Sequence, residues 1–176
     1  MPAKPTQLGY LLHELDGAIK AEFTHASWHK LVQGFFSNAE MRAAFRVCPA
    51  AKGVHHAYVG GLLEHTLSVF NLCRRIADQY PELDRQTLLA GALFHDIGKL
   101  REFSGGLAND YTDEGRLLGH LMLGIEMLAP FMARSRPSRA AVKAPQVASR
   151  INVLWLFWGS SRPLLFSLSR MYPNYT

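Results

Sequence analysis

The sequence predicts an all-α fold in which helices pack around one core. Apolar residues recur at spacings of three and four along most of the chain, the pattern of amphipathic helices. Alternating strand patterns, Asn-Gly hairpin turns and internal repeats are all lacking. The length of 176 residues, with 48% hydrophobic and 19% charged residues, is ordinary for one globular domain. We therefore expect a helical bundle.

Three helices are predicted in the N-terminal part of the chain. The first covers residues 6–23, where an apolar stripe comprises Leu8, Leu11, Leu12, Leu15, Ile19 and Phe23. Two shorter helices are expected over 27–36 and 38–45, with Ser37 or Asn38 capping the start of the latter. Pro49 then ends the helical pattern.

Two longer apolar patterns follow. One predicts a buried helix over residues 56–80, with Gly60-Gly61 allowing close backbone approach near its start. The other predicts a helix over 84–96, capped by Asp84 and ending near Gly98. The His-Asp pair at positions 95 and 96 is thus expected at a helix end.

A loop and one further helix complete the predicted bundle. Residues 101–112 are rich in Ser, Gly, Asn and Asp, which indicates a loop. Thr112 or Asp113 can cap the next helix, which carries His120–Phe131. We expect Pro130 to end or kink this helix.

Charge divides the chain near residue 133. Residues 1–133 hold 12 basic and 14 acidic residues, whereas 134–176 hold seven Lys/Arg and no acidic residue. We predict N-terminal helices (1–44) packed on a core domain (45–133), followed by a basic, atypical tail (134–176). Such a tail can attract nucleic acid or anionic lipid, or can be a solvated extension.

The expected location is cytoplasmic. The N-terminus lacks the apolar core of a secretory signal, and no uninterrupted apolar run reaches the roughly 18 residues of a membrane span. Two cysteines without metal-ligand spacing fit a reducing compartment. The apolar run Ile151–Trp158 is too short to span a bilayer, so we expect no stable membrane insertion. A homo-oligomer is compatible with these features.

A metal centre is the main functional prediction. Imidazole and carboxylate groups are good ligands for first-row divalent metals, and His95-Asp96 together with His65 can converge from two helices. Asp96 can also bridge two ions, with His120 as the ligand of the second. The chemistry expected of such a centre is activation of water and polarisation of a phosphoryl oxygen.

Three further residues are candidates for the site. Lys99 shares the face of the His-Asp pair if the helix continues, so we expect it to hold a substrate phosphate and to act with Asp96 in catalysis. Arg116, four residues before His120, has a planar fork suited to phosphate oxygens. His56 is a candidate for facing the substrate. An exposed helix charge is the alternative interpretation of Lys99 and Arg116.

With His65 as the first histidine and His95-Asp96 as the doublet, the chain resembles the HD superfamily of metal-dependent phosphohydrolases. Over residues 45 to 130 it is similar to the HD domain of the YhaM-type 3′→5′ exoribonucleases, in the strings 49–56, 60–66, 95–99 and 111–120. The resemblance implies an HD-type helical bundle that hydrolyses phosphodiesters with one or two divalent ions. Mn²⁺ is favoured, with Mg²⁺, Fe²⁺, Co²⁺, Ni²⁺ or Zn²⁺ as alternatives.

Two departures from that family leave several functions open. Its members carry an OB-fold domain ahead of the HD domain, whereas residues 1–44 here have a helical pattern. The family pattern also continues with a His-His pair and a late aspartate, but no His follows His120 and no acidic residue follows Glu126. One hypothesis is that the tail is a divergent or frameshifted replacement of the usual C-terminal helices. The expected function is hydrolysis of a nucleotide or of an RNA 3′ end. One alternative is hydrolysis of a small or cyclic nucleotide, and another is an inactive HD domain with a binding or structural role.

Overall fold

The computed structural model describes residues 5–53, 56–105 and 110–135, which form seven α-helices and no β-strand. The predicted all-α fold is confirmed. In chain order the helices are α1 (Pro5–Glu22), α2 (Ala26–Phe36), α3 (Ala39–Val47), α4 (Gly61–Gln79), α5 (Arg85–Phe94), α6 (Lys99–Glu102) and α7 (Asp113–Ser135).

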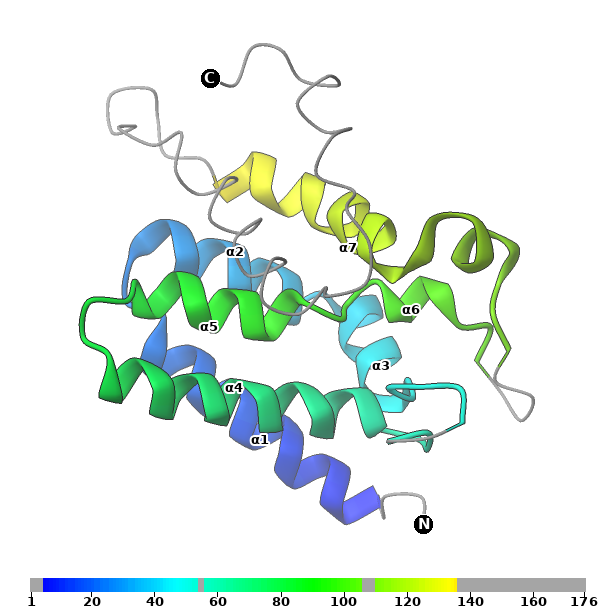
Figure 1. Cartoon of the computed structure of the whole chain (residues 1–176), viewed down its shortest axis with the longest axis horizontal. Coiled ribbons are helices and arrows are strands. Elements are labelled where there is room, and N and C mark those ends of the chain that lie inside the picture. Colours follow the sequence, from blue (N-terminus) through cyan, green and yellow to red (C-terminus); the bar gives the residue numbers. More distant parts are fainter. Residues whose placement is uncertain (1–4, 54–55, 106–109, 136–176) are drawn as a thin grey trace. The chain divides into compact units, whose positions relative to one another are not determined.

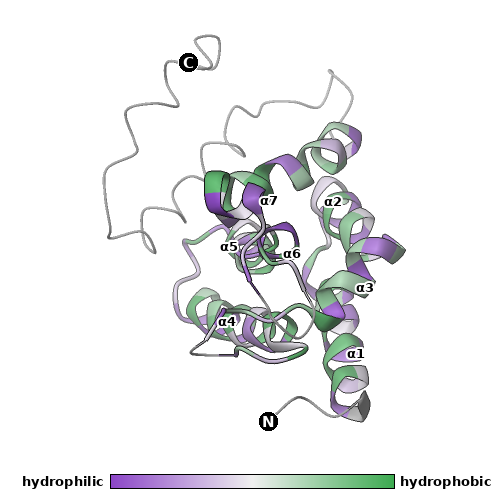
Figure 2. Ribbon diagram, turned by 90° about the vertical axis from the view of Figure 1, so that its right-hand side faces the viewer, coloured by the Kyte–Doolittle hydropathy of each residue, from purple (hydrophilic) through white to green (hydrophobic). Residues whose placement is uncertain are grey.

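The helices are arranged in two layers. Helices α1, α2 and α3 form one layer, and α4, α5, α6 and α7 form the other (Figure 1; Figure 2). The layers meet through contacts of α1 and α3 with α4 and of α2 with α7. Apolar faces of both layers bury into one core, in which the ring of Phe35 contacts those of Phe36, Phe94 and Phe131. The predicted boundary at residues 44/45 falls within α3, which shares this core through Phe45.

The predicted caps are present where helices begin. The side chain of Asn38 accepts a hydrogen bond from the backbone N–H of Met41, and that of Asp84 accepts one from Thr87. Each satisfies a backbone donor that lacks a partner within its own helix. These polar side chains fix the first residues of α3 and α5, and α5 leads directly to the His-Asp pair.

Three predicted boundaries were wrong. The helix expected over 56–80 begins at Gly61, because His56 and Gly60 adopt left-handed backbone conformations (φ 57° and 82°) that a right-handed helix excludes. His56 therefore lies ahead of α4. Helix α5 ends at Phe94, and a turn over residues 95–98 leads into the short α6. The loop expected from residue 101 accordingly starts at Phe103, after α6.

Pro130, which was expected to end or kink this helix, does not end it. The helix continues through Pro130 to Ser135, and its one non-helical residue is Gly119 (φ 70°, ψ 159°). This backbone conformation is accessible to glycine and strained for residues with a Cβ. Gly119 therefore divides α7 immediately before the candidate ligand His120.

Helix α7 is long and apolar enough, by length and composition, to cross a membrane. Core helices of soluble bundles meet the same criterion. Here α7 contacts α2 and α6 and contributes Met127 and Leu128 to the core, and 22% of its apolar window is buried. The predictions for the basic tail and its apolar run concern residues outside the described ranges, apart from Arg134 and Ser135.

Candidate metal centre

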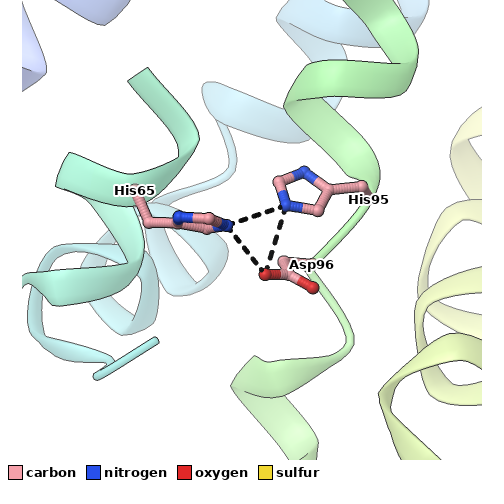
Figure 3. A group of neighbouring side chains, drawn as sticks. All are labelled: His65, His95 and Asp96. Atoms are coloured by element: carbon pink, nitrogen blue, oxygen red, sulfur yellow. Dashed lines mark hydrogen bonds and ion pairs between the residues drawn. The ribbon is translucent and has the colours of Figure 1, made fainter. Parts of the chain in front are cut away.

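Three predicted ligands converge where α4 begins and α5 ends. His65 lies in the first turns of α4, His95 follows the last residue of α5, and Asp96 lies in the turn after it (Figure 3). The Nε2 atoms of His65 and His95 are 3.1 Å apart. Asp96 Oδ2 lies 3.4 Å from the first and 3.2 Å from the second. These three atoms form a compact triangle of potential metal donors.

The triangle has the dimensions of donors that share one ion. Ligands at metal distances of about 2.0–2.2 Å in tetrahedral or octahedral geometry lie about 3.0–3.4 Å from one another. His95 Nδ1 lies 2.9 Å from the carbonyl oxygen of Ala92. Since a carbonyl only accepts, Nδ1 carries a proton, which leaves Nε2 as the ring atom that could coordinate a metal in place of a proton. The donor set and this tautomer both fit a divalent first-row metal.

The electrostatics of the centre keep Asp96 ionised. Burial acts to raise the pKa of its carboxyl group, but hydrogen bonds with His65 and His95 and the charge of Lys99 outweigh it, so that the pKa lies well below its usual range. Only 9% of the Asp96 side chain is exposed. A buried carboxylate held in its charged form is the ligand that a cation site requires.

His120 approaches the other oxygen of the same carboxylate. Its Nε2 lies 3.6 Å from Asp96 Oδ1, whereas His65 and His95 face Oδ2. The predicted ligands thus divide over the two oxygens of one aspartate. This is the arrangement expected of a carboxylate that bridges two positions.

Close backbone packing brings His120 to the doublet. Gly98, two residues after Asp96, lies against α7 so closely that a Cβ there would overlap the carbonyl oxygen of His120 and press on the backbone N of Gly124. Any side chain at position 98 would therefore push α7 away from the turn that carries Asp96. The lack of a side chain at Gly98 therefore allows His120 on α7 to lie close to Asp96.

Lys99 contacts the centre directly. Its Nζ lies 2.7 Å from Asp96 Oδ2, in an i,i+3 pair, and 17% of its side chain is exposed. The predicted proximity of Lys99 to the His-Asp pair is therefore present in the structure. Its ammonium group thus places a positive charge directly beside the donor triangle.

His56 lies beside His65, their ring centroids being 5.8 Å apart. Its Nδ1 is 2.9 Å from the hydroxyl oxygen of Tyr58, and that hydroxyl donates to Glu64 Oε2 at 2.6 Å. Because the Tyr58 proton is directed to Glu64, the Tyr58 oxygen accepts from His56 Nδ1–H. The bond to Glu64 raises the pKa of Tyr58 to about 12, so this donor stays protonated at neutral pH.

Arg116 is directed elsewhere. Its guanidinium lies 3.2 Å from Asp110 Oδ1, an oxygen that is also 2.8 Å from Lys52 Nζ. The Arg116 side chain is 60% exposed. The structure does not bring it to the histidine cluster, unlike the other residues predicted for the site.

Sequence reasoning missed the residues that support the ligands. Glu102 holds His120, and the pair Tyr58 and Glu64 orients His56. One signal was available for Glu102, which is the only acidic residue between Asp96 and Asp110. Its contact with a ligand 18 positions away was not visible in any local pattern.

The described helices thus form a bundle in which further histidines converge on a histidine-aspartate doublet, a class of fold and site that could hold a metal. A family model described as "HD domain" matches residues 62–152, just over half of the chain. The chain belongs to the HD domain family, as the resemblance of its motifs predicted.

Similar proteins with curated names are 3′-5′ exoribonucleases. The chain is 47% identical over 87 residues to YhaM of Bacillus subtilis (strain 168), covering 49% of this chain and 28% of that protein. It is 47% identical over 81 residues to YhaM of Bacillus licheniformis (46% and 26%) and 44% identical over 78 residues to YhaM of Listeria monocytogenes serotype 4b (44% and 25%). The matched part thus spans about a quarter of these relatives. No solved structure gives a significant match.

Proposed function

We propose that this protein is a metal-dependent phosphohydrolase that cleaves phosphodiester bonds at the 3′ end of RNA or in a nucleotide. The observation that carries the proposal is the triangle of His65, His95 and Asp96, with His120 on the second oxygen of Asp96. The names of the similar exoribonucleases support the RNA substrate. The chemistry of the donors supports a divalent metal, for which we favour Mn²⁺.

The residues of the centre have separate roles in this proposal. Asp96, His65, His95 and His120 would hold the metal, as one or two ions. A divalent ion bound there lowers the pKa of water and polarises a phosphoryl oxygen. Lys99 binds a non-bridging oxygen of the scissile phosphate, for which its ammonium group is suited.

His56 completes the proposed substrate contacts. Its Nδ1–H is engaged by Tyr58, which leaves Nε2 as the ring atom able to contact a ligand. The ring lies beside that of His65, next to the metal centre. We assign His56 to contact the substrate and Tyr58 with Glu64 to orient it. Arg116 is the more remote candidate, bound through Asp110 to Lys52.

Two other functions are alternatives to this proposal. The first is hydrolysis of a small or cyclic nucleotide, which the same donor set could serve. The absence of any His after position 120 and of any acidic residue after position 126 favours an HD domain that binds without turnover. Degradation of a labelled single-stranded RNA compared with hydrolysis of cyclic nucleotides separates the first alternative from the proposal.

The direct test measures metal content together with Mn²⁺-dependent hydrolysis of bis-p-nitrophenyl phosphate. We expect bound metal and turnover in the wild-type protein, and loss of both in Asp96→Ala. The matched control is Asp16→Ala, which removes an aspartate from an exposed ion pair with Arg42 and should retain both properties. Unchanged metal content in folded Asp96→Ala would contradict the site, and bound metal without turnover would support the binding domain.

A further inference from the structure

We propose that Glu102 is a positioning residue for His120, whose Nε2 it holds toward Asp96 Oδ1 so that a second divalent ion can bind. This inference rests on the proposed function, because it concerns the second position of the same metal centre. It assigns a role to a buried carboxylate that the mechanism above does not use.

The environment of Glu102 requires an explanation. Only 9% of its side chain is exposed, and a buried carboxylate is costly unless donors compensate for its lost hydration. Both compensating donors that the structure shows belong to His120. Glu102 Oε1 accepts from the backbone N–H of His120 at 3.0 Å and lies 3.1 Å from its Nδ1. Glu102 thus contacts both the backbone and the ring of His120.

The break in helix α7 at Gly119 makes the backbone contact between His120 and Glu102 possible. The non-helical conformation of Gly119 divides α7, so that the second part of the helix begins at His120, whose N–H donates to Glu102 Oε1. The Glu102 carboxylate takes the place of an N-terminal capping side chain, although it lies 18 positions earlier in the chain. A negative charge at a helix N-terminus is also favoured by the helix dipole.

The contact with the ring selects one form of His120. A carboxylate accepts hydrogen bonds and has no proton to give, so Nδ1 must carry the proton. Nε2 then presents its lone pair, and it is this atom that lies 3.6 Å from Asp96 Oδ1. A carboxylate behind a histidine ring is the usual means by which proteins fix the tautomer and direction of a metal ligand.

Glu102 and His120 are each fixed by a second set of contacts. The carbonyl oxygen of Glu102 accepts from the backbone N–H of Thr112 at 2.9 Å, which ties α6 to the residue before α7. The carbonyl oxygen of His120 lies against Gly98. These contacts fix the backbones of both residues. The hydrogen bond from the Glu102 carboxylate can therefore orient the His120 ring.

A purely structural role for Glu102, as a cap of α7, makes different predictions. The control for it is Thr112→Val. The Thr112 hydroxyl accepts from Gly115 N–H at 2.8 Å and caps the first part of α7, and it also contacts the carbonyl oxygens of Arg101 at 2.9 Å and Glu102 at 3.3 Å. This variant removes those backbone contacts, whereas the hydrogen bonds between the Glu102 carboxylate and His120 keep both of their partners.

The experiment is a calorimetric titration of the metal-free protein with Mn²⁺, combined with NMR of the imidazole nitrogens. We expect two binding steps in the wild-type protein, and the Nδ1–H tautomer of His120. In Glu102→Ala the weaker step should lose about 10–100-fold in affinity and the tautomer should change, while the tighter step is retained. Glu102→Gln, whose amide oxygen still accepts both hydrogen bonds, should largely restore the weaker step. Thr112→Val should retain both steps.

A double mutant strengthens the test. If Glu102 acts through His120, Glu102→Ala combined with His120→Ala should bind Mn²⁺ as His120→Ala does alone, whereas independent roles would give additive losses. An unchanged weaker step and tautomer in Glu102→Ala would overturn the inference, as would a single Mn²⁺ step in the wild-type protein. The proposed function would survive either of these results. It would fail if the wild-type protein neither bound Mn²⁺ nor hydrolysed the diester.

Discussion

A carboxylate with little exposed surface lies beside each end of the α4–α5 pair, but the partners of the two carboxylates differ in kind. At one end Glu22, with a side chain 10% exposed, pairs with the guanidinium groups of Arg74 and Arg85 at 2.9 and 2.7 Å. At the other end Asp96, with a side chain 9% exposed, faces three imidazole rings and the Lys99 ammonium group. Little of either carboxylate side chain is exposed, although Asp96 is the more deeply buried residue.

The difference in partners separates a structural site from a functional one. A guanidinium is always charged and only donates, so the Glu22 cluster is complete with protein groups alone. An imidazole with its Nδ1–H engaged offers a lone pair, as His95 does, and can bind a metal. The two sites also differ in the contacts that hold their parts together. Flexible arginine side chains make these contacts at Glu22, whereas a close backbone contact at Gly98 makes them near Asp96. Each of these differences can be tested by substitution.

Gly98→Ala should have the largest effect. The added Cβ meets the backbone of α7, which cannot rotate aside as a side chain can, so we expect a loss of about 3 kcal/mol or more in the free energy of unfolding. His120 should also move from Asp96, so that the weaker Mn²⁺ step is lost. Urea unfolding and Mn²⁺ titration measure the two effects.

The matched control for Gly98→Ala is Gly17→Ala. Gly17 lies within α1 with nothing within 4 Å of the position of a Cβ, so alanine there should stabilise the protein by about 0.5–1 kcal/mol through helix propensity. A Gly98→Ala protein that is as stable as wild type and binds Mn²⁺ normally would show that the close backbone contact does not position His120.

Glu22→Gln tests the structural end. The amide keeps one acceptor for two arginines that are 44% and 35% exposed, so water compensates in part for the lost charge. We expect destabilisation of about 1–3 kcal/mol with Mn²⁺ affinity unchanged. Reduced Mn²⁺ affinity in this variant would mean that the two ends are coupled through α4 and α5, against their separation into structural and functional clusters.

The candidate metal ligands could be predicted from the sequence better than the residues that orient them. His65, His95 and Asp96 are found together because helix periodicity and the caps of the helices determine where they lie. Glu102 and the break at Gly119 were missed, because both depend on contacts between segments distant in the chain. The start of α4 was misplaced for a similar reason, since the left-handed conformation of His56 carries no signal in residue type. Local patterns therefore identify the ligands, and tertiary packing determines how they are directed.

The pH dependence of the Glu22 cluster is the next prediction. The hydrogen bond from Arg85 lowers the pKa of Glu22 despite its burial, so the folded-state pKa lies below the value of about 4.3 expected in the unfolded chain. The resulting stability is present above the unfolded pKa and is lost as pH falls through the folded one. The stability difference between wild type and Glu22→Gln should thus be constant near neutral pH and shrink below about pH 4. Urea unfolding at a series of pH values measures this difference, and a gap that persists in acid would assign the effect to packing.

The smallest effect is expected for an ion pair that belongs to neither end. Arg42 binds Asp16 through two hydrogen bonds of 2.8 and 2.6 Å, a geometry as good as that of the Glu22 cluster. Half of the Asp16 side chain is exposed, however, so water replaces much of what the pair provides. Arg42→Ala should therefore cost less than about 1 kcal/mol in urea unfolding, and its effect should diminish with added salt. A loss equal to that of Glu22→Gln would show that the geometry of the hydrogen bonds, and not burial of the carboxylate, decides how much such a pair stabilises this bundle.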